Sequence, residues 1–292
     1  MTDATPSQRN LTQQSIAIVQ QNKNMMIFPI ISTILMMATF VVGLTPLFKI
    51  EASIWSHDGY VSGKTFATFM IILLVIFFIV GMVTLLFNAA LTACTLKHIR
   101  QEPYTISLGL KTMLILFGKI LLIKIFYDGI AIYVKFMRYW VDDWTKSPMS
   151  MRIVSGLPWN DAVLLIVPVL VAENTGFFET LKRSAELVKN KWGTDVTFRS
   201  NSFSRTLALI GVFALAPLVV GIIIGGSTAI IIGAAITVLI STIKTIVHST
   251  TQVILNCALY LYATDVDTSA FFDTELLKKS FRPLTKKELH IS

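Results

Sequence analysis

The sequence has few charged residues. Asp, Glu, Lys and Arg make up 14% of the 292 residues, whereas hydrophobic residues make up 54%. A soluble chain carries about 25% charged residues, so much of the surface of this protein must face something other than water. The mean hydropathy of +0.68 agrees with this. The composition therefore argues against an ordinary soluble globular protein and predicts an integral membrane protein.

Cysteine is scarce, and the familiar catalytic motifs are missing. Cys94 and Cys257 both lie in apolar runs, and two such thiols make neither a disulfide framework nor a metal site. The chain has no G-x-S-x-G, H-E-x-x-H or P-loop motif, and no paired acidic motif in an apolar run. We therefore predict a non-enzymatic protein without catalytic residues, metal or cofactor. An intramembrane enzyme whose catalytic groups lie far apart in the sequence stays open.

The net charge of +8 has two interpretations. A basic chain can bind nucleic acid, but this sequence has no aromatic–basic RNA-binding pattern and no zinc-finger spacing. Lysine and arginine also collect on the cytoplasmic loops of membrane proteins. We therefore predict that the partner is a lipid bilayer, with no nucleic acid.

Long apolar runs recur along nearly the whole chain. A run of about 18 or more apolar residues predicts a membrane span. The fold class that we predict is an all-α, polytopic transmembrane helical bundle, with one membrane domain over 25–263. Its six predicted spans cover about 25–48, 65–96, 106–134, 157–173, 206–224 and 228–262.

Two of the predicted spans are too long for a bilayer. Helices over 65–96 and 228–262 would measure roughly 48 and 52 Å, against a hydrocarbon core of about 30 Å. We expect both to tilt strongly or to project beyond the bilayer.

Amphipathic segments flank the predicted spans. Residues 1–24 form an N-terminal segment with a short amphipathic helix, and 264–292 form a polar tail. Residues 174–192 predict a basic amphipathic helix that lies in the headgroup plane. Its candidate membrane-surface basic residues are Lys182, Arg183, Lys189 and Lys191.

The distribution of basic residues predicts the orientation. The N-terminus, the 97–111 loop, the 174–205 segment and the tail together hold 16 Lys and Arg, and the loops of the opposite side hold 6. The richer side faces the cytoplasm, so we predict a multi-pass protein with both termini cytoplasmic.

Polar residues form a stripe on each of the two overlong helices. Asn88 begins Asn-Ala-Ala-Leu in 65–96, and Asn256 begins Asn-Cys-Ala-Leu in 228–262. Thr84 and Gln252 lie one turn upstream of these asparagines, on the same faces. One interpretation is a hydrated cleft or docking surface that opens to the cytoplasm. The other is hydrogen bonding between helices, in which Ser, Thr and Asn are common.

Lys119 is the charge that the sequence places deepest in the membrane. It lies near the middle of 106–134, where a lysine costs at least ~2.5–3.5 kcal/mol and needs a partner or water. Candidate partners are Asp161 and Asp128, the latter one turn after Lys124. The cluster could lie along a substrate path. The alternatives are a buried ion pair or a shifted span.

Three features near the ends of the predicted spans complete the candidates. Lys244 and His248 lie near the inner surface, where lysine can snorkel and the histidine is either solvated or part of a proton relay. Gly221 and Gly225 form a G-x-x-x-G pattern beside a Gly-Gly turn. Here we expect close packing within a hairpin rather than a dimer contact.

Several motifs together resemble a known family. They are Ser15-x-x-Ile18-Val19-x-x-Asn22-Lys23, Phe87-Asn88-Ala-Ala-Leu91, Val167-Pro168-Val-Leu170 with Glu173 and Leu181-Lys-Arg-Ser184, and Ala258-Leu-Tyr260-Leu-Tyr262. The chain resembles a family of bacterial integral membrane proteins known only as a domain of unknown function. The resemblance implies six helical spans in the bacterial inner membrane and no assigned activity. Residues 125–157 depart from the family, since they are aromatic and charged here.

Two functions are compatible with these patterns. The leading hypothesis is a non-enzymatic scaffold, partner-binding or lipid-interacting module, with a membrane or cytoplasmic protein as a further partner. The alternative is a transporter or channel for a small solute or ion that uses the intramembrane polar residues. The sequence leaves the oligomeric state open.

Overall fold

The computed structural model describes residues 6–55, 63–140, 163–194, 196–198 and 215–283. In these ranges the chain is helical, apart from one small antiparallel sheet of two strands. The predicted all-α class is therefore confirmed.

The first half of the chain contains two long helices that pack against each other. Its elements are α1 (Pro6–Gln21), the 3-10 helix η1 (Lys23–Met26), α2 (Ile27–Trp55), α3 (Gly63–Ile99), α4 (Ile106–Ile115) and α5 (Phe117–Trp140). The predicted span over 106–134 is broken, because α4 and the first part of α5 meet at 63°.

The second half begins with short helices and then forms another hairpin. Its elements are α7 (Ile166–Glu173), α8 (Phe177–Trp192), β1 (Val196–Phe198), α10 (Ala216–Ile224), α11 (Ser227–Ala263), α12 (Thr274–Lys278) and β2 (Phe281–Pro283). The two strands pair with Val196 opposite Pro283 and Phe198 opposite Phe281.

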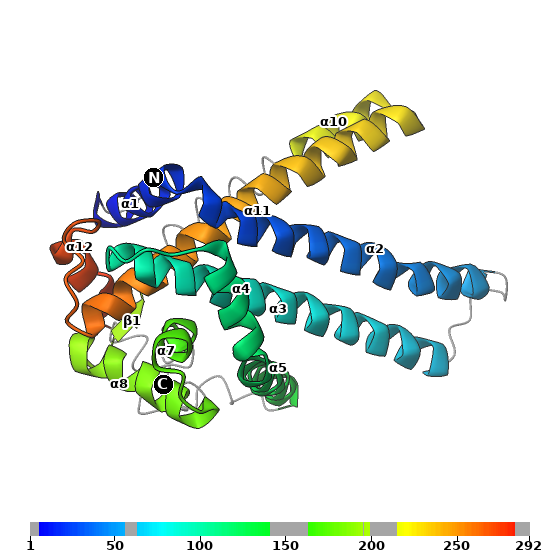
Figure 1. The fold of residues 1–292 in the computed structure, drawn as a ribbon. Coiled ribbons are helices and arrows are strands. Elements are labelled where there is room, and N and C mark those ends of the chain that lie inside the picture. Colours follow the sequence, from blue (N-terminus) through cyan, green and yellow to red (C-terminus); the bar gives the residue numbers. More distant parts are fainter. Residues whose placement is uncertain (1–5, 56–62, 141–162, 195, 199–214, 284–292) are drawn as a thin grey trace.

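Figure 1 shows two long hairpins that diverge from a compact base. One arm consists of α2 and the first part of α3, and the other of α10 and the first part of α11. The base consists of α1, η1, α7, α8, α12, the small sheet and the C-terminal parts of α3 and α11. Because α1 packs against both α11 and α12, the first and last described helices lie together in the base.

The long helices α3 and α11 change character along their length. Their N-terminal parts expose large apolar side chains, for example Phe77 at 61% and Ile231 at 67%, whereas residues from Met82 and Thr250 onward are largely buried. The exposed parts, 64–80 and 228–248, measure about 26 and 32 Å. This matches a hydrocarbon core of about 30 Å, so each helix has one apolar length suited to lipid and one packed in protein.

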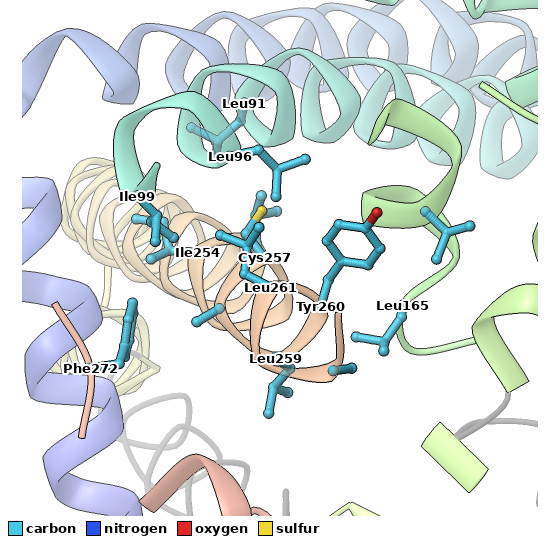
Figure 2. Packing of buried hydrophobic residues seen from close by; sticks show 14 of the residues in the cluster. Leu91, Leu96, Ile99, Leu165, Ile254, Cys257, Leu259, Tyr260, Leu261 and Phe272 are labelled. Atoms are coloured by element: carbon cyan, nitrogen blue, oxygen red, sulfur yellow. The ribbon is translucent and has the colours of Figure 1, made fainter. Parts of the chain in front are cut away.

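The core of the base lies where the C-terminal parts of α3 and α11 meet. Figure 2 shows Leu91 and Leu96 of α3 beside Ile254 and Cys257 of α11. Leu91, Ile254 and Cys257 have no exposed surface. Both cysteines are free and buried, as predicted.

The described residues do not support the predicted six spans. Three helices in them are long and apolar enough to cross a membrane, or four if α4 and α5 form one bent span. The prediction differs most over 157–173, where α7 has only eight residues, about 12 Å of helix. Val169 and Leu170 of α7 are fully buried in the base. Residues 157–162 and 206–214 lie outside the described residues, so α10 covers only part of the predicted span over 206–224.

Helix α8 is amphipathic, as predicted, but the environment of its apolar side is different. Its buried residues are Thr180, Leu181, Ser184, Ala185, Leu187 and Val188. They pack against the base, where helices α7 and α11 are its neighbours. Most of the apolar side of α8 is thus covered by protein, whereas Phe178 is 69% exposed.

The close packing predicted for Gly221 occurs between α10 and α11. A Cβ atom at Gly221 would lie 2.5 Å from the carbonyl oxygen of Ala229, and one at Gly233 would lie 2.4 Å from that of Pro217. Gly225 adopts φ 78° in the turn between the helices, a conformation that favours glycine. Glycine therefore permits this hairpin at both its helix contacts and its turn.

Candidate functional site

A cavity of about 510 Å³ lies where the arms join the base. The polar residues that line it are Thr84 and Asn88 from α3, Lys124 from α5, and Gln252 and Asn256 from α11. The apolar part of its wall includes Leu85, Ile123, Tyr127, Ile166, Val167 and Phe177. Residues from five helices, α3, α5, α7, α8 and α11, thus form one chamber with a polar and an apolar wall.

The two asparagines singled out in the sequence meet at this cavity. Gln252 Nε2 donates to Asn256 Oδ1 at 3.1 Å, one turn apart on α11. Ser249 Oγ donates to Asn88 Oδ1 at 3.4 Å and so links α11 to α3. Both interpretations of the polar stripes therefore hold in part, since hydrogen bonds join the helices and an open volume remains beside them.

Lys124 is the charged residue of the cavity wall. Its side chain is only 10% exposed, and its Nζ lies 2.6 Å from Asp128 Oδ1. The ammonium also lies 5.7 Å from the centre of the Phe78 ring. A carboxylate partner and an aromatic face lower the cost of holding this charge away from water. Asp128 is therefore the partner of Lys124, not of Lys119.

Gly81 makes room for Lys124. A Cβ atom at this position of α3 would lie 2.4 Å from both Cε and Nζ of Lys124. The lysine side chain consequently lies directly against the helix at a residue without a side chain. Sequence reasoning missed Gly81, because a lone glycine in an apolar helix carries no signal of what will pack on it.

Lys119 lies outside the cavity and binds the C-terminal end of α7. Its ammonium donates to the backbone carbonyl of Asn174 and, at 2.8 Å, to Asn174 Oδ1. Asn174 ends α7 in the left-handed conformation, φ 51°, and a cation there satisfies the end of the helix. The expected pair between Lys119 and Asp128 is therefore wrong, and Asp161 lies outside the described residues.

Lys244 and His248 lie one turn apart on α11, near the end of its exposed part. Both side chains are partly buried, and neither lines the cavity.

The four basic residues of α8 divide into two groups. Lys182 and Lys189 are exposed. Arg183 pairs with Glu173 at 3.2 Å, and Lys191 forms an ion pair with Asp265. Two of the four predicted membrane-surface residues therefore attach α8 to its neighbours in the base.

Glu173 forms a junction that sequence reasoning missed. It accepts from Arg183 Nε of α8 and, at 3.2 Å, from Tyr260 Oη of α11, so one carboxylate joins three helices. All three residues belong to the motifs that carry the family resemblance, which was the available signal. Their separation in the sequence hid the contact.

A second polar junction ties the N-terminal segment to α3. Asn22 Nδ2 lies 3.0 Å from His98 Nε2, and Tyr104 Oη donates to Asn22 Oδ1 at 3.0 Å. Burial raises the pKa of Tyr104, so the phenol keeps the proton that it donates.

These features define a class: an all-helical protein with apolar hairpins long enough to cross a membrane and a cavity between them and a packed base. The chain belongs to a family of unknown function (DUF6159), whose model matches residues 67–271. The match includes every residue named above as lining the cavity. Neither a search of curated proteins nor a search of solved structures found a match.

Proposed function

We propose that the protein is a non-enzymatic, lipid-interacting membrane protein whose cavity holds part of a lipid at the level of the membrane surface. The position of the cavity carries this proposal. Its wall includes Gly81 and Gln252, which lie directly beyond the exposed apolar parts of α3 and α11. With those parts in the hydrocarbon core, the cavity lies where lipid headgroups begin.

The chemistry of the cavity supports an amphiphilic ligand. Lys124, Thr84 and three side-chain amides form a polar wall, and the remainder is mainly aliphatic and aromatic. Ligand sites are typically apolar with a few placed polar groups. Tyr127 lines the cavity and is 42% exposed, so this wall reaches the outer surface, where a lipid can enter from the side.

The base gives a basis for orientation. Exposed basic residues gather on it, among them Arg100, Lys182, Lys189, Lys278 and Lys279. The positive-inside rule supports a cytoplasmic base, with α1 and α12 on that side of a bacterial inner membrane. The exposed surface of the base is also where a membrane or cytoplasmic protein partner would bind.

A transporter is less well supported. Lys119 motivated it, and this residue binds the end of α7 instead of lining a path. The cavity also lies at one end of the apolar hairpins, whereas transporter sites lie near the bilayer midplane.

The test is native mass spectrometry of the purified protein with added phospholipid. Val167→Trp fills the cavity and leaves its polar wall intact, and Val238→Trp, on the exposed surface of α11, is the matched control. We expect phospholipid adducts on the wild type and Val238→Trp, and at least about tenfold weaker binding to Val167→Trp. Equal binding to all three proteins, or none to the wild type, contradicts the proposal.

A further inference from the structure

We infer that the cavity recognises the phosphate of a glycerophospholipid, with Lys124 as its cationic contact. This inference rests on the lipid-binding function proposed above and adds the group that is recognised. It predicts that a lipid without phosphate, such as diacylglycerol, binds poorly although its acyl chains are the same.

The charges of the cavity wall point to an anion. Among the described residues that line it, Lys124 is the one charged group, and no carboxylate faces the cavity from that set. Asp128 lies beside the lysine but is not part of the lining. A phosphate therefore meets a cation and neutral donors there.

Lys124 can hold a phosphate and keep its partner. An ammonium has three N–H donors, and Asp128 accepts through the two oxygens of a single carboxylate. A donor is left for a ligand, and the partly exposed Asp128 keeps the charge compensated while the cavity is empty.

The amides supply further donors. Asn88 and Asn256 accept through their oxygens from Ser249 and Gln252. In the described part of the chain, no bond from the amide nitrogen of either asparagine to protein is seen. Phosphate oxygens are acceptors, so these N–H groups complement them.

The apolar wall argues for a lipid as the source of the phosphate. Ile123, Ile166, Val167 and Phe177 line the same chamber. Acyl chains would cover these residues, and inorganic phosphate would leave them exposed to water. Inorganic phosphate alone should therefore compete weakly.

The experiment measures binding of phosphatidylglycerol, of diacylglycerol with the same acyl chains, and of inorganic phosphate as competitor, again by native mass spectrometry in detergent. For the wild type we expect phosphatidylglycerol to bind at least about tenfold more tightly than diacylglycerol. Lys124→Gln should abolish this difference. Lys182→Gln removes the same charge from the exposed side of α8 and should preserve it.

Two further variants distinguish a loss of phosphate recognition from a loss of folding. Lys124→Gln combined with Asp128→Asn removes the ion pair as a unit, so no buried charge is left unpaired. Gly81→Ala keeps both charges and pushes the lysine ammonium aside. Both should retain the wild-type melting temperature within a few degrees and lose the preference for phosphatidylglycerol.

The outcomes separate the two proposals. Equal binding of phosphatidylglycerol and diacylglycerol to the wild type overturns the phosphate inference and leaves lipid binding intact. So does a preference that persists in Lys124→Gln. Displacement of phosphatidylglycerol by an equal concentration of inorganic phosphate identifies a free-phosphate site and overturns it too. If neither lipid binds, the proposed function itself fails.

Discussion

At the scale of single residues, the observed roles of charged side chains differ from those expected from their positions along the apolar runs. Lys119 binds the C-terminal end of α7, Lys124 faces a cavity, and Arg183 and Lys191 attach α8 to the rest of the base. Except for Lys124, whose ion-pair partner Asp128 lies one turn away on α5, the partner comes from a distant part of the chain. Glu173 is the clearest example, because it receives one bond from α8 and one from α11.

Tyr260→Phe tests the Glu173 junction. Losing the phenol hydroxyl removes one hydrogen bond to a carboxylate, so we expect the free energy of unfolding to fall by about 1–2 kcal/mol. Tyr262→Phe is the control, because Tyr262 contacts Trp192 and Lys191 through its ring. Denaturant unfolding in detergent, followed by tryptophan fluorescence, measures both. An equal loss in the two variants would show that the hydroxyl of Tyr260 contributes nothing specific.

At the scale of elements, the α10–α11 hairpin depends on the absence of side chains. Gly221 and Gly233 bring the two helix backbones together, and the nearest atoms are carbonyl oxygens that cannot rotate away. Gly118 of α5 has no such role, because a Cβ atom at that position would meet nothing within 4 Å.

Gly221→Ala and Gly118→Ala should therefore act in opposite directions. The first forces the hairpin apart and should lower the melting temperature by several degrees, at a cost of about 1–3 kcal/mol. The second replaces glycine in an open helical position and should stabilise by up to about 1 kcal/mol. Thermal unfolding in one detergent compares them. If Gly221→Ala unfolds at or above the wild-type temperature, the close contact is not needed.

At the scale of the whole molecule, both apolar arms extend from one base, and both ends of the described chain lie in that base. This arrangement agrees with the orientation proposed above, in which α1 and α12 lie on the same side of the membrane. It also separates the protein into a part with exposed apolar helices and a packed part, with the cavity at their boundary.

Single-cysteine labelling tests the orientation. Both native cysteines are buried, so new thiols can be introduced at exposed sites: Gln13 on α1, Glu275 on α12 and Thr228 at the turn of the α10–α11 hairpin. In intact cells with a permeable outer membrane, an impermeant maleimide should label Thr228→Cys. It should reach Gln13→Cys and Glu275→Cys only after the inner membrane is opened. The reverse pattern would place the base outside.

Much of the architecture was predictable because it follows from local pattern. Apolar runs indicated the long helices, helical spacing indicated α8, and Gly-Gly indicated the turn before α11. The described residues do not support the six-span count, because a short apolar run does not distinguish a span from a buried helix, and Val169 and Leu170 of α7 are buried within the base. Asn88, Asn256 and Lys124 were predicted as candidates, but their shared cavity was not.

The sequence by itself determined that this is a helical chain with apolar hairpins, since hydropathy and the spacing of apolar residues are properties of neighbouring residues. The tertiary structure decided which polar groups meet. Lys124 reaches the cavity because Gly81, 43 positions earlier in the numbering, leaves space on α3, and Asn88 faces α11 through Ser249. Such contacts depend on how helices pack, and packing depends on the shapes of surfaces that come from distant parts of the chain.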